Sequence, residues 1–243
     1  MKLLIIRHGD PDYALDSLTP VGFREAELLV KRLEKQNIKS FFVSPLGRAQ
    51  ATIKPTLEKL GKSATTLDWL REFPVVIEGK NNRPGHSCAW DWLPEIWTAD
   101  QSCFDKDNWM EFKAFQSTDA KQKYKEVCDG LDALLADNGY RRDGSIYRAE
   151  CANEDTIALV CHFGLECVLL SHLLNISPML LWHGMCAAPS SVTTLVTEER
   201  REGIAYFRML SFGDTSHLYV EDVEPSFAAR FCETFDSQDQ RHD

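Results

Sequence analysis

Residues 3–9 read LLIIRHG, four apolar residues followed directly by Arg7, His8 and Gly9. A short continuous apolar run is typical of a strand that is buried on both faces, as in a parallel sheet. Residues 156–164, TIALVCHFG, repeat the arrangement and end on His162, Phe163 and Gly164. Polar residues and glycine directly after such strands mark the carboxyl edge of an α/β sheet, where these proteins place their sites.

Capping signals predict the helices that accompany these strands. Thr19-Pro20 starts a helix that should end near Asn37, and Ser44-Pro45 starts a second that should end at Gly61. Further short strands are predicted at 41–43, 65–67, 191–197 and 204–212, the last two perhaps antiparallel to each other. We therefore expect a three-layer α/β/α sandwich with a mostly parallel sheet.

The stretch from residue 73 to residue 119 has weak periodicity and holds four of the six tryptophans. An amphipathic helix follows over 124–135, and Asp143-Gly144 indicates a hairpin turn. We expect one domain over 1–243, in which residues 73–150 are inserted as a cap over the carboxyl edge of the sheet.

Composition limits the partners of the chain. Lys and Arg total 27 against 37 Asp and Glu, a formal net charge of -10, which favours neither nucleic acid nor an anionic membrane as a partner. No apolar run approaches the length of a membrane span, and the run before Arg7 is too short for a signal peptide. The sequence indicates no oligomeric state.

Eight cysteines are scattered along the chain without a CxxC pair, unlike a zinc ribbon or a disulfide framework. We expect free thiols and a reducing, cytoplasmic setting.

Five residues that suit phosphate chemistry lie at or just past predicted strand ends: Arg7, His8, Arg48, Glu72 and His162. Arginine forks bind phosphate oxygens bidentately, and a helix N-terminus near Phe163-Gly164 adds a partial positive charge. In an acidic chain, such a local cluster is what a phosphate site requires.

An ordered set of motifs resembles the histidine phosphatase superfamily, the phosphoglycerate-mutase-like proteins. The matching motifs are Arg7-His8-Gly9, Leu18-Thr19-Pro20-x-Gly22, Ser44-Pro45-Leu46-x-Arg48-Ala49-x-x-Thr52, Leu70-x-Glu72 and His162-x-Gly164. Asp214-Thr215-Ser216-His217-Leu218 resembles a tail segment of members that hydrolyse phosphate esters, so the resemblance runs from residue 3 to about residue 218.

The resemblance implies a role for each residue of the cluster. His8 would attack phosphorus and become phosphohistidine, while Arg7, Arg48 and His162 would hold the phosphoryl oxygens. Glu72 would protonate the leaving oxygen and then take a proton from water. The arginines and His162 would supply the charge of a metal, so neither a metal nor another cofactor is expected.

Several assignments stay open at this point. Glu78 or Glu95 could replace Glu72 as the acid. Many relatives carry an asparagine after the nucleophile, where residues 13–17 here read YALDS, and Ser17 could substitute for it. Three further residues could contribute to the site: Gly9, His86 in the insertion and His217 in the tail.

The function expected is phosphomonoester hydrolysis through a phosphohistidine on His8. The expected partner is a small phosphorylated substrate whose identity the sequence leaves undefined. A phosphoglycerate-mutase-type phosphoryl transfer and a non-catalytic phosphate-binding module are the alternatives. Glycolytic mutases of the family carry a Trp-Asn pair after the RHG and a later Gly-Trp, and this chain has neither.

Overall fold

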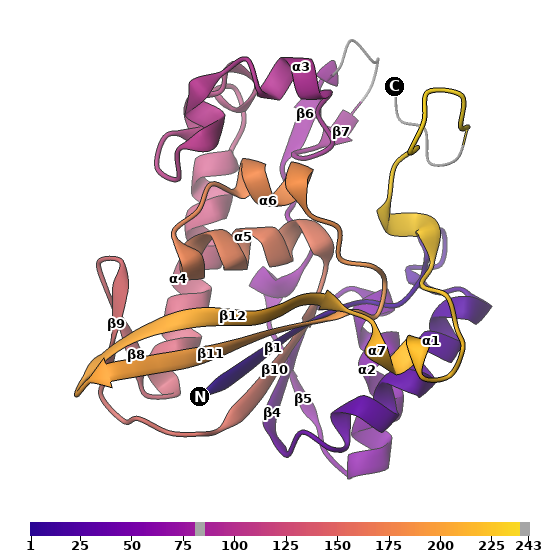
Figure 1. The fold of residues 1–243 in the computed structure, drawn as a ribbon, viewed down its shortest axis with the longest axis vertical. Helices are drawn as coiled ribbons and strands as arrows, with labels where there is room; N and C mark the ends of the chain where they lie inside the picture. The colour runs from indigo at the N-terminus through magenta and orange to yellow at the C-terminus, as the bar shows by residue number, and fades with distance from the viewer. Residues whose placement is uncertain (81–85, 239–243) are drawn as a thin grey trace.

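The computed structural model describes residues 1–80 and 86–238 and has a central sheet of eight strands (Figure 1). In spatial order the strands are β5 (Ala64–Thr66), β4 (Ile38–Val43), β10 (Thr156–Cys161), β1 (Lys2–Arg7), β11 (Val192–Arg201), β12 (Ile204–Asp214), β9 (Ile146–Ala149) and β8 (Tyr140–Asp143). The first four strands are parallel to one another. The remaining four continue the sheet in antiparallel fashion, so its core is parallel.

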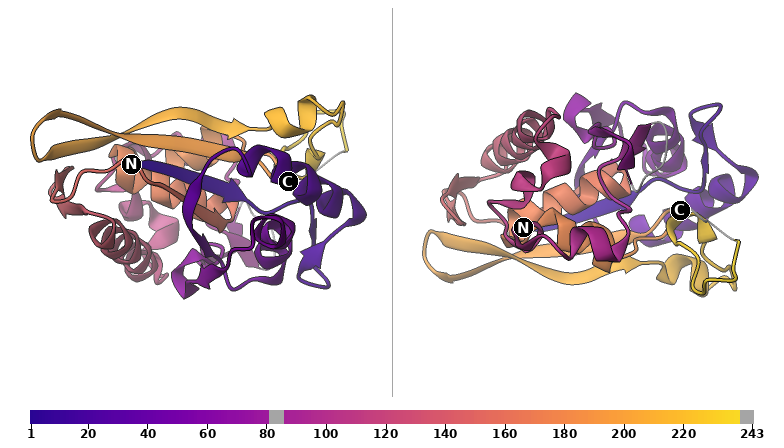
Figure 2. Two further views of the ribbon diagram at one scale, coloured as in Figure 1. Left: turned by 90° about the horizontal axis from the view of Figure 1, so that it is seen from below. Right: turned by 90° about the horizontal axis from the view of Figure 1, so that it is seen from above.

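Helices cover both faces of this sheet, which confirms the predicted α/β fold. The helices are α1 (Pro20–Leu33), α2 (Gly47–Leu60), α3 (Pro94–Trp97), α4 (Ala120–Asp137), α5 (Phe163–Leu174), α6 (Pro178–Gly184) and α7 (Ser216–Tyr219). Two small hairpins, β2 (Pro11–Asp12) with β3 (Ser17–Leu18) and β6 (Val76–Glu78) with β7 (His86–Cys88), lie outside the main sheet. Figure 2 shows the ribbon of β11 and β12 along one side of the molecule.

The alternation of side chains along β1 explains the layers. Leu3 and Ile5 face the larger hydrophobic core, which includes residues of α4, α5 and α6. Leu4 and Ile6 face a second core with residues of α1 and α2. Because all four side chains are at most 2% exposed, the strand must be apolar throughout. The apolar run therefore reflects burial on both sides.

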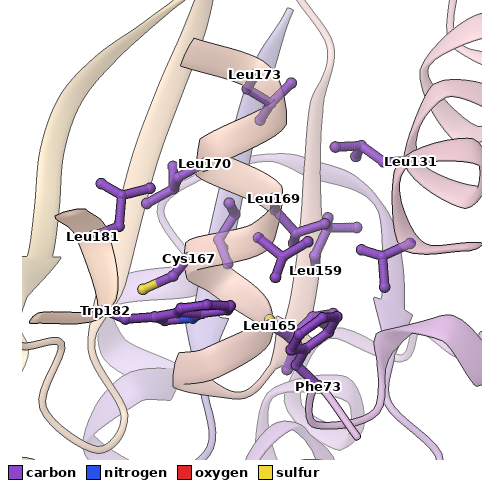
Figure 3. Packing of buried hydrophobic residues seen from close by; sticks show 14 of the residues in the cluster. Phe73, Leu131, Leu159, Leu165, Cys167, Leu169, Leu170, Leu173, Leu181 and Trp182 are labelled. Atoms are coloured by element: carbon purple, nitrogen blue, oxygen red, sulfur yellow. The ribbon is translucent and has the colours of Figure 1, made fainter. Parts of the chain in front are cut away.

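Helix α5 lies at the centre of the larger core (Figure 3). Its buried side chains contact Leu131 of α4 on one side and Leu181 and Trp182 of α6 on the other, while Leu159 of β10 lies beneath it. The residues from Phe163 to Leu174 are mostly apolar all round, as expected for a helix with few solvent-facing positions. This packing holds the N-terminus of α5 rigidly at the end of β10.

One predicted helix start is correct and the other is wrong. Thr19 caps α1 by accepting a hydrogen bond from the Gly22 amide, and Pro20 is the first helical residue. By contrast, α2 begins at Gly47 rather than after Ser44-Pro45, and its N-cap residue Leu46 provides no side-chain acceptor. The Ser44 hydroxyl is engaged in the site described below.

Residues 73–150 contribute to more than one layer. The hairpin of β6 and β7 and the short helix α3 lie beyond α6 (Figure 1). Three short 3-10 turns follow at Gln101–Phe104, Trp109–Glu111 and Lys113–Phe115. Helix α4 then packs on α5, and the hairpin predicted at Asp143-Gly144 is present as β8 and β9, the outer strands of the main sheet.

Glu166 is a buried carboxyl in the first turn of α5. It is 1% exposed, and a side-chain hydrogen bond with Thr193 and the nearby Arg7 charge both favour its ionised form. Burial raises its pKa to about 7, because a charged carboxylate in this apolar surrounding is poorly solvated. The folded state therefore holds a proton that the unfolded chain releases near its ordinary pKa of 4.5.

This difference makes stability depend on pH. As pH rises from about 4.5 to about 7, Glu166 should cost the protein about 3 kcal/mol of unfolding free energy. Glu166→Gln cannot ionise and should lose about that much less stability between pH 4.5 and pH 8, measured by urea unfolding. Glu202→Gln changes an exposed side chain and serves as the control. Identical pH dependence in Glu166→Gln and wild type would contradict the assignment.

Candidate active site

Backbone register brings the ends of three parallel strands together. The His8 amide, just past β1, donates to the Cys161 carbonyl of β10 at 3.0 Å. The Ser44 amide, just past β4, donates to the Val160 carbonyl of β10 at 2.9 Å. His162, the next residue after β10, therefore lies between the other two strand ends. The imidazole rings of His8 and His162 have their centroids 5.1 Å apart.

His8 is held as a neutral imidazole with a defined tautomer. Its Nδ1 lies 2.7 Å from the Gly9 carbonyl oxygen, and a carbonyl can only accept, so Nδ1 carries the proton. The side chain is 2% exposed, and burial, followed by the nearby Arg7 charge, lowers its pKa well below the ordinary value of 6.5. The lone pair is therefore on Nε2 near neutral pH.

Gly9 permits the close approach that positions His8. A β-carbon at Gly9 would lie 2.9 Å from the Gly22 carbonyl oxygen of α1, closer than a real side chain tolerates. The Gly9 amide donates to the Thr52 hydroxyl of α2 at 2.8 Å, and this hydroxyl donates to the Arg48 carbonyl at 2.7 Å. The third residue of the RHG sequence thus anchors the loop that carries His8 to both helices on its side of the sheet.

Arg7 is buried behind the two histidines at 6% exposure. Its Nη1 donates to the Ala187 carbonyl at 2.5 Å, and its guanidinium lies 5.7 Å from the ring centroid of Phe163. Among the described residues, the buried Nε of Arg7 has no acceptor, and neither has the buried Nε of Arg48. Both arginines therefore retain donors for an anion.

Arg48 projects from the first turn of α2 and is held by Asp16. The Asp16 carboxylate accepts from Arg48 Nη1 at 2.8 Å and from the Gly47 amide at 2.7 Å. Burial pushes the pKa of Asp16 up, but these hydrogen bonds outweigh burial and the pKa lies below its usual value. Asp16 is thus ionised and supplies the α2 cap that Leu46 lacks. The ring of Tyr13 lies 5.4 Å from the Arg48 guanidinium.

His162 is fully buried and hydrogen-bonded to the Ser44 hydroxyl, with 2.8 Å between its Nε2 and Oγ. Burial lowers its pKa well below the ordinary value, and the neighbouring His8, Arg48 and Arg7 act in the same direction. Its Nδ1 is buried without a partner in the described part of the chain. Sequence reasoning missed Ser44 as a site residue because Ser-Pro is also a helix-start signal.

Glu72 follows the 3-10 turn Asp68–Leu70, and its carboxyl group reaches the N-terminus of α5. Its Oε1 accepts from the Phe73 and Leu165 amides, both at 2.9 Å. Burial raises the pKa of Glu72 above its ordinary value of 4.5, while these two amides act in the opposite direction. The alternatives named from the sequence, Glu78 and Glu95, have exposed side chains.

Gly164 leaves room for the contact between the insertion and the site. A β-carbon there would lie 2.2 Å from an atom of the Trp90 ring and 2.8 Å from Glu72 Oε1. The Gly164 carbonyl accepts from the indole of Trp182 at 3.0 Å, and the rings of Trp90 and Trp182 lie 6.1 Å apart. The aromatic insertion therefore contacts the helix start beside the carboxyl group.

The three other residues singled out from the sequence occupy different positions. His217 is buried, and its Nε2 lies 3.1 Å from the hydroxyl of Ser190, whose amide donates to the His8 carbonyl. Ser190 therefore links His217 to His8 through two hydrogen bonds. Ser17 lies in β3, paired with Asp12, whereas its neighbour Asp16 makes the contact with Arg48. His86 begins β7, and its side chain lies outside what the structure describes.

Other features bear on ligands and location. In the described residues, no three His, Cys, Asp or Glu side chains form a group suited to a metal ion. All eight cysteines, each in the described part of the chain, are free thiols. No helix within residues 1–80 and 86–238 has the length and apolar character needed to cross a membrane.

Comparison with known proteins places this geometry in a family. The sequence profile described as the histidine phosphatase superfamily (branch 1) matches residues 3–209. The chain belongs to this superfamily. The resemblance carried by the RHG, SPLxRA and HxG motifs is thereby confirmed. The match includes His8 and His162, the residues that directly follow β1 and β10. A comparison with the curated proteins found no match.

Solved structures of superfamily phosphatases share the fold. A phosphoserine phosphatase from Entamoeba histolytica, in complex with phosphoserine, is 20% identical, with a TM-score of 0.61, covering 89% of this chain and 98% of its own. A mycobacterial glucosyl-3-phosphoglycerate phosphatase is 18% identical, with a TM-score of 0.59, covering 88% and 99%. At these identities the likeness concerns the architecture.

Inorganic phosphate should bind this cluster and stabilise the folded protein. At a phosphate concentration about 100 times the Kd, the stabilisation expected from linkage is about 2.7 kcal/mol, seen as a rise in Tm. Arg48→Ala should lose most of this rise, because it removes a charge and the donors that lie beside the histidines. Arg24→Ala, on the exposed face of α1, is the matched control. An equal Tm rise in Arg48→Ala would place the anion elsewhere.

Proposed function

We propose that this protein is a phosphatase that hydrolyses phosphate monoesters through a phosphohistidine on His8. The observation that carries the proposal is the tautomer of His8, which is fixed by the Gly9 carbonyl and leaves Nε2 unprotonated within a cluster of two arginines and a second histidine. Membership of the histidine phosphatase superfamily supports it.

In the first step, the Nε2 lone pair attacks phosphorus and the bond to the ester oxygen breaks. Burial favours this reaction because the imidazole is neutral and needs no base to remove a proton. In the transition state the negative charge of the phosphoryl group is spread over its three equatorial oxygens. Arg7, Arg48 and His162 act as the donors, and their unpartnered nitrogens can meet these oxygens without breaking a protein hydrogen bond.

Glu72 acts as the acid and then as the base. Its raised pKa favours the protonated form, which gives its proton to the departing oxygen. The resulting carboxylate then takes a proton from the water that attacks the phosphohistidine, and His8 and inorganic phosphate are released. The amides of Phe73 and Leu165 stabilise that carboxylate between the two steps.

Within the insertion expected over residues 73–150, the part up to residue 119 serves as the cap that shapes the substrate pocket, because α4, β8 and β9 belong to the layers of the main sheet. Trp90 packs on Gly164 next to Glu72, and Trp182 packs on Trp90. Lys80 and Asp91 form a buried ion pair within this segment, with 2.9 Å between Nζ and Oδ1. A buried pair of this kind favours one arrangement of the surrounding loops over looser ones.

Replacement of the nucleophile tests the mechanism directly. His8→Ala should lower kcat for p-nitrophenyl phosphate by roughly 10⁴- to 10⁶-fold, the range expected when a covalent nucleophile is removed. A base-stable, acid-labile phosphoenzyme should form in wild type and not in the variant. His172→Ala, which removes an imidazole paired with Asp132 at the other end of α5, is the control. Hydrolysis by His8→Ala at the wild-type rate would refute the mechanism.

The acid is tested by comparing leaving groups. Glu72→Gln should lower kcat/KM for the alkyl ester glycerol 3-phosphate by roughly 10²–10⁴, because an alkoxide must be protonated as it leaves. It should affect the first step with p-nitrophenyl phosphate far less, since p-nitrophenolate leaves unprotonated. Glu78→Gln and Glu95→Gln are the controls. A selective loss in either of them would reassign the acid, and an isomeric ester instead of free phosphate would indicate a mutase.

A further inference from the structure

The segment between the nucleophile and the first helix has an unusual charge for a phosphate site. Residues 10–17 read DPDYALDS, with three aspartates and no lysine or arginine. Asp12 uses its carboxylate locally, accepting from the Ala14 and Leu15 amides. Asp16 differs, because its carboxylate is directed at Arg48, one of the two arginines of the site.

The backbone fixes Asp16 in this position. Its φ of 44° lies in the left-handed region, which is uncommon for a residue with a side chain. A β-carbon at Gly47 would lie 2.1 Å from the Asp16 carbonyl oxygen, so the loop is packed tightly against the start of α2. With the Gly47 amide and Arg48 Nη1 both donating to it, the carboxylate is anchored at two points.

The ion pair between Asp16 and Arg48 sets the charge on the side of the site where α2 begins. Asp16 neutralises one unit of the positive charge that Arg48 would otherwise offer, and its side chain is 46% exposed, so it remains open to a ligand. Next to it, the ring of Tyr13 is 69% exposed and contributes no charge. Among the described residues, Arg48 is the cation that acts on Asp16, so a second anionic group placed here would meet the like charge of the Asp16 carboxylate.

Resting on the proposed function, we infer that Asp16 determines specificity by disfavouring phosphate esters whose leaving group carries a carboxylate. The phosphate itself still meets Arg7, His162 and the remaining donors of Arg48. In a substrate whose leaving group extends past Arg48, a carboxylate a few atoms from the phosphorus would meet the Asp16 carboxylate, and like charges at short range in a partly desolvated site repel strongly. Leaving groups that are uncharged or carry an amine avoid this repulsion.

This separates the protein from structural neighbours whose ligands are phosphoserine and 3-phosphoglyceric acid, both of which bear a carboxylate. Glycerol 3-phosphate and 3-phosphoglycerate make a matched pair for the test, because they differ only in a hydroxymethyl group where the second has a carboxylate.

The experiment measures kcat/KM for both esters and their inhibition constants as competitors of p-nitrophenyl phosphate hydrolysis. Wild type should prefer glycerol 3-phosphate by about 10- to 100-fold in at least one of these measures. Asp16→Asn keeps the shape of the side chain, and it should bring that ratio within a few-fold of one by improving 3-phosphoglycerate selectively. Asp12→Asn removes the same charge from the same segment and should leave the ratio unchanged.

Two results would overturn the inference. A ratio near one in wild type would show that no discrimination exists. An equal loss for both esters in Asp16→Asn would show that Asp16 only positions Arg48. If the wild-type protein hydrolyses no ester, the proposed function fails, and the Kd values of the two esters measured by calorimetry in wild type and both variants still decide the role of Asp16.

Discussion

The hydrogen bond from the His8 amide to the Cys161 carbonyl is the contact on which the site depends. It continues the parallel register of β1 and β10 by one residue beyond the strand, so the histidines that follow both strands lie side by side. Because side chains alternate along a strand, a slip of one residue would turn Leu3 and Ile5 out of their core and separate the two imidazoles. Core packing and site geometry are therefore set by the same register.

Burial around this register has opposite effects on different groups. It keeps His8 and His162 neutral, as the proposed nucleophilic attack by His8 requires, and it raises the pKa of Glu72, the proposed acid. The same burial raises the pKa of Glu166 in the first turn of α5, which makes the fold less stable as pH rises. The surroundings that favour phosphoryl transfer thus carry a cost in stability.

Two carboxyl groups from distant parts of the chain complete the helices that begin at the site. Asp16 accepts from the Gly47 amide at the start of α2, and Glu72 accepts from the Leu165 amide at the start of α5. Neither N-cap residue, Leu46 or His162, caps its helix with its own side chain. Each carboxyl group therefore joins a loop to a helix terminus and also lies beside a group proposed to handle phosphate.

The sequence by itself determined the sheet and most of its helices, because apolar runs and capping residues report local burial and backbone geometry. It also determined the family, through motifs such as RHG and HxG that depend on residues close together in the chain. Only the tertiary structure decided that Asp16 reaches Arg48, and that Ser44 bonds His162 instead of capping a helix. Asp16 and Arg48 are 32 positions apart in the sequence, and Ser44 and His162 are 118 positions apart. These two contacts follow from strand order and from how a loop packs on a helix terminus, and local sequence preferences carry no information about either.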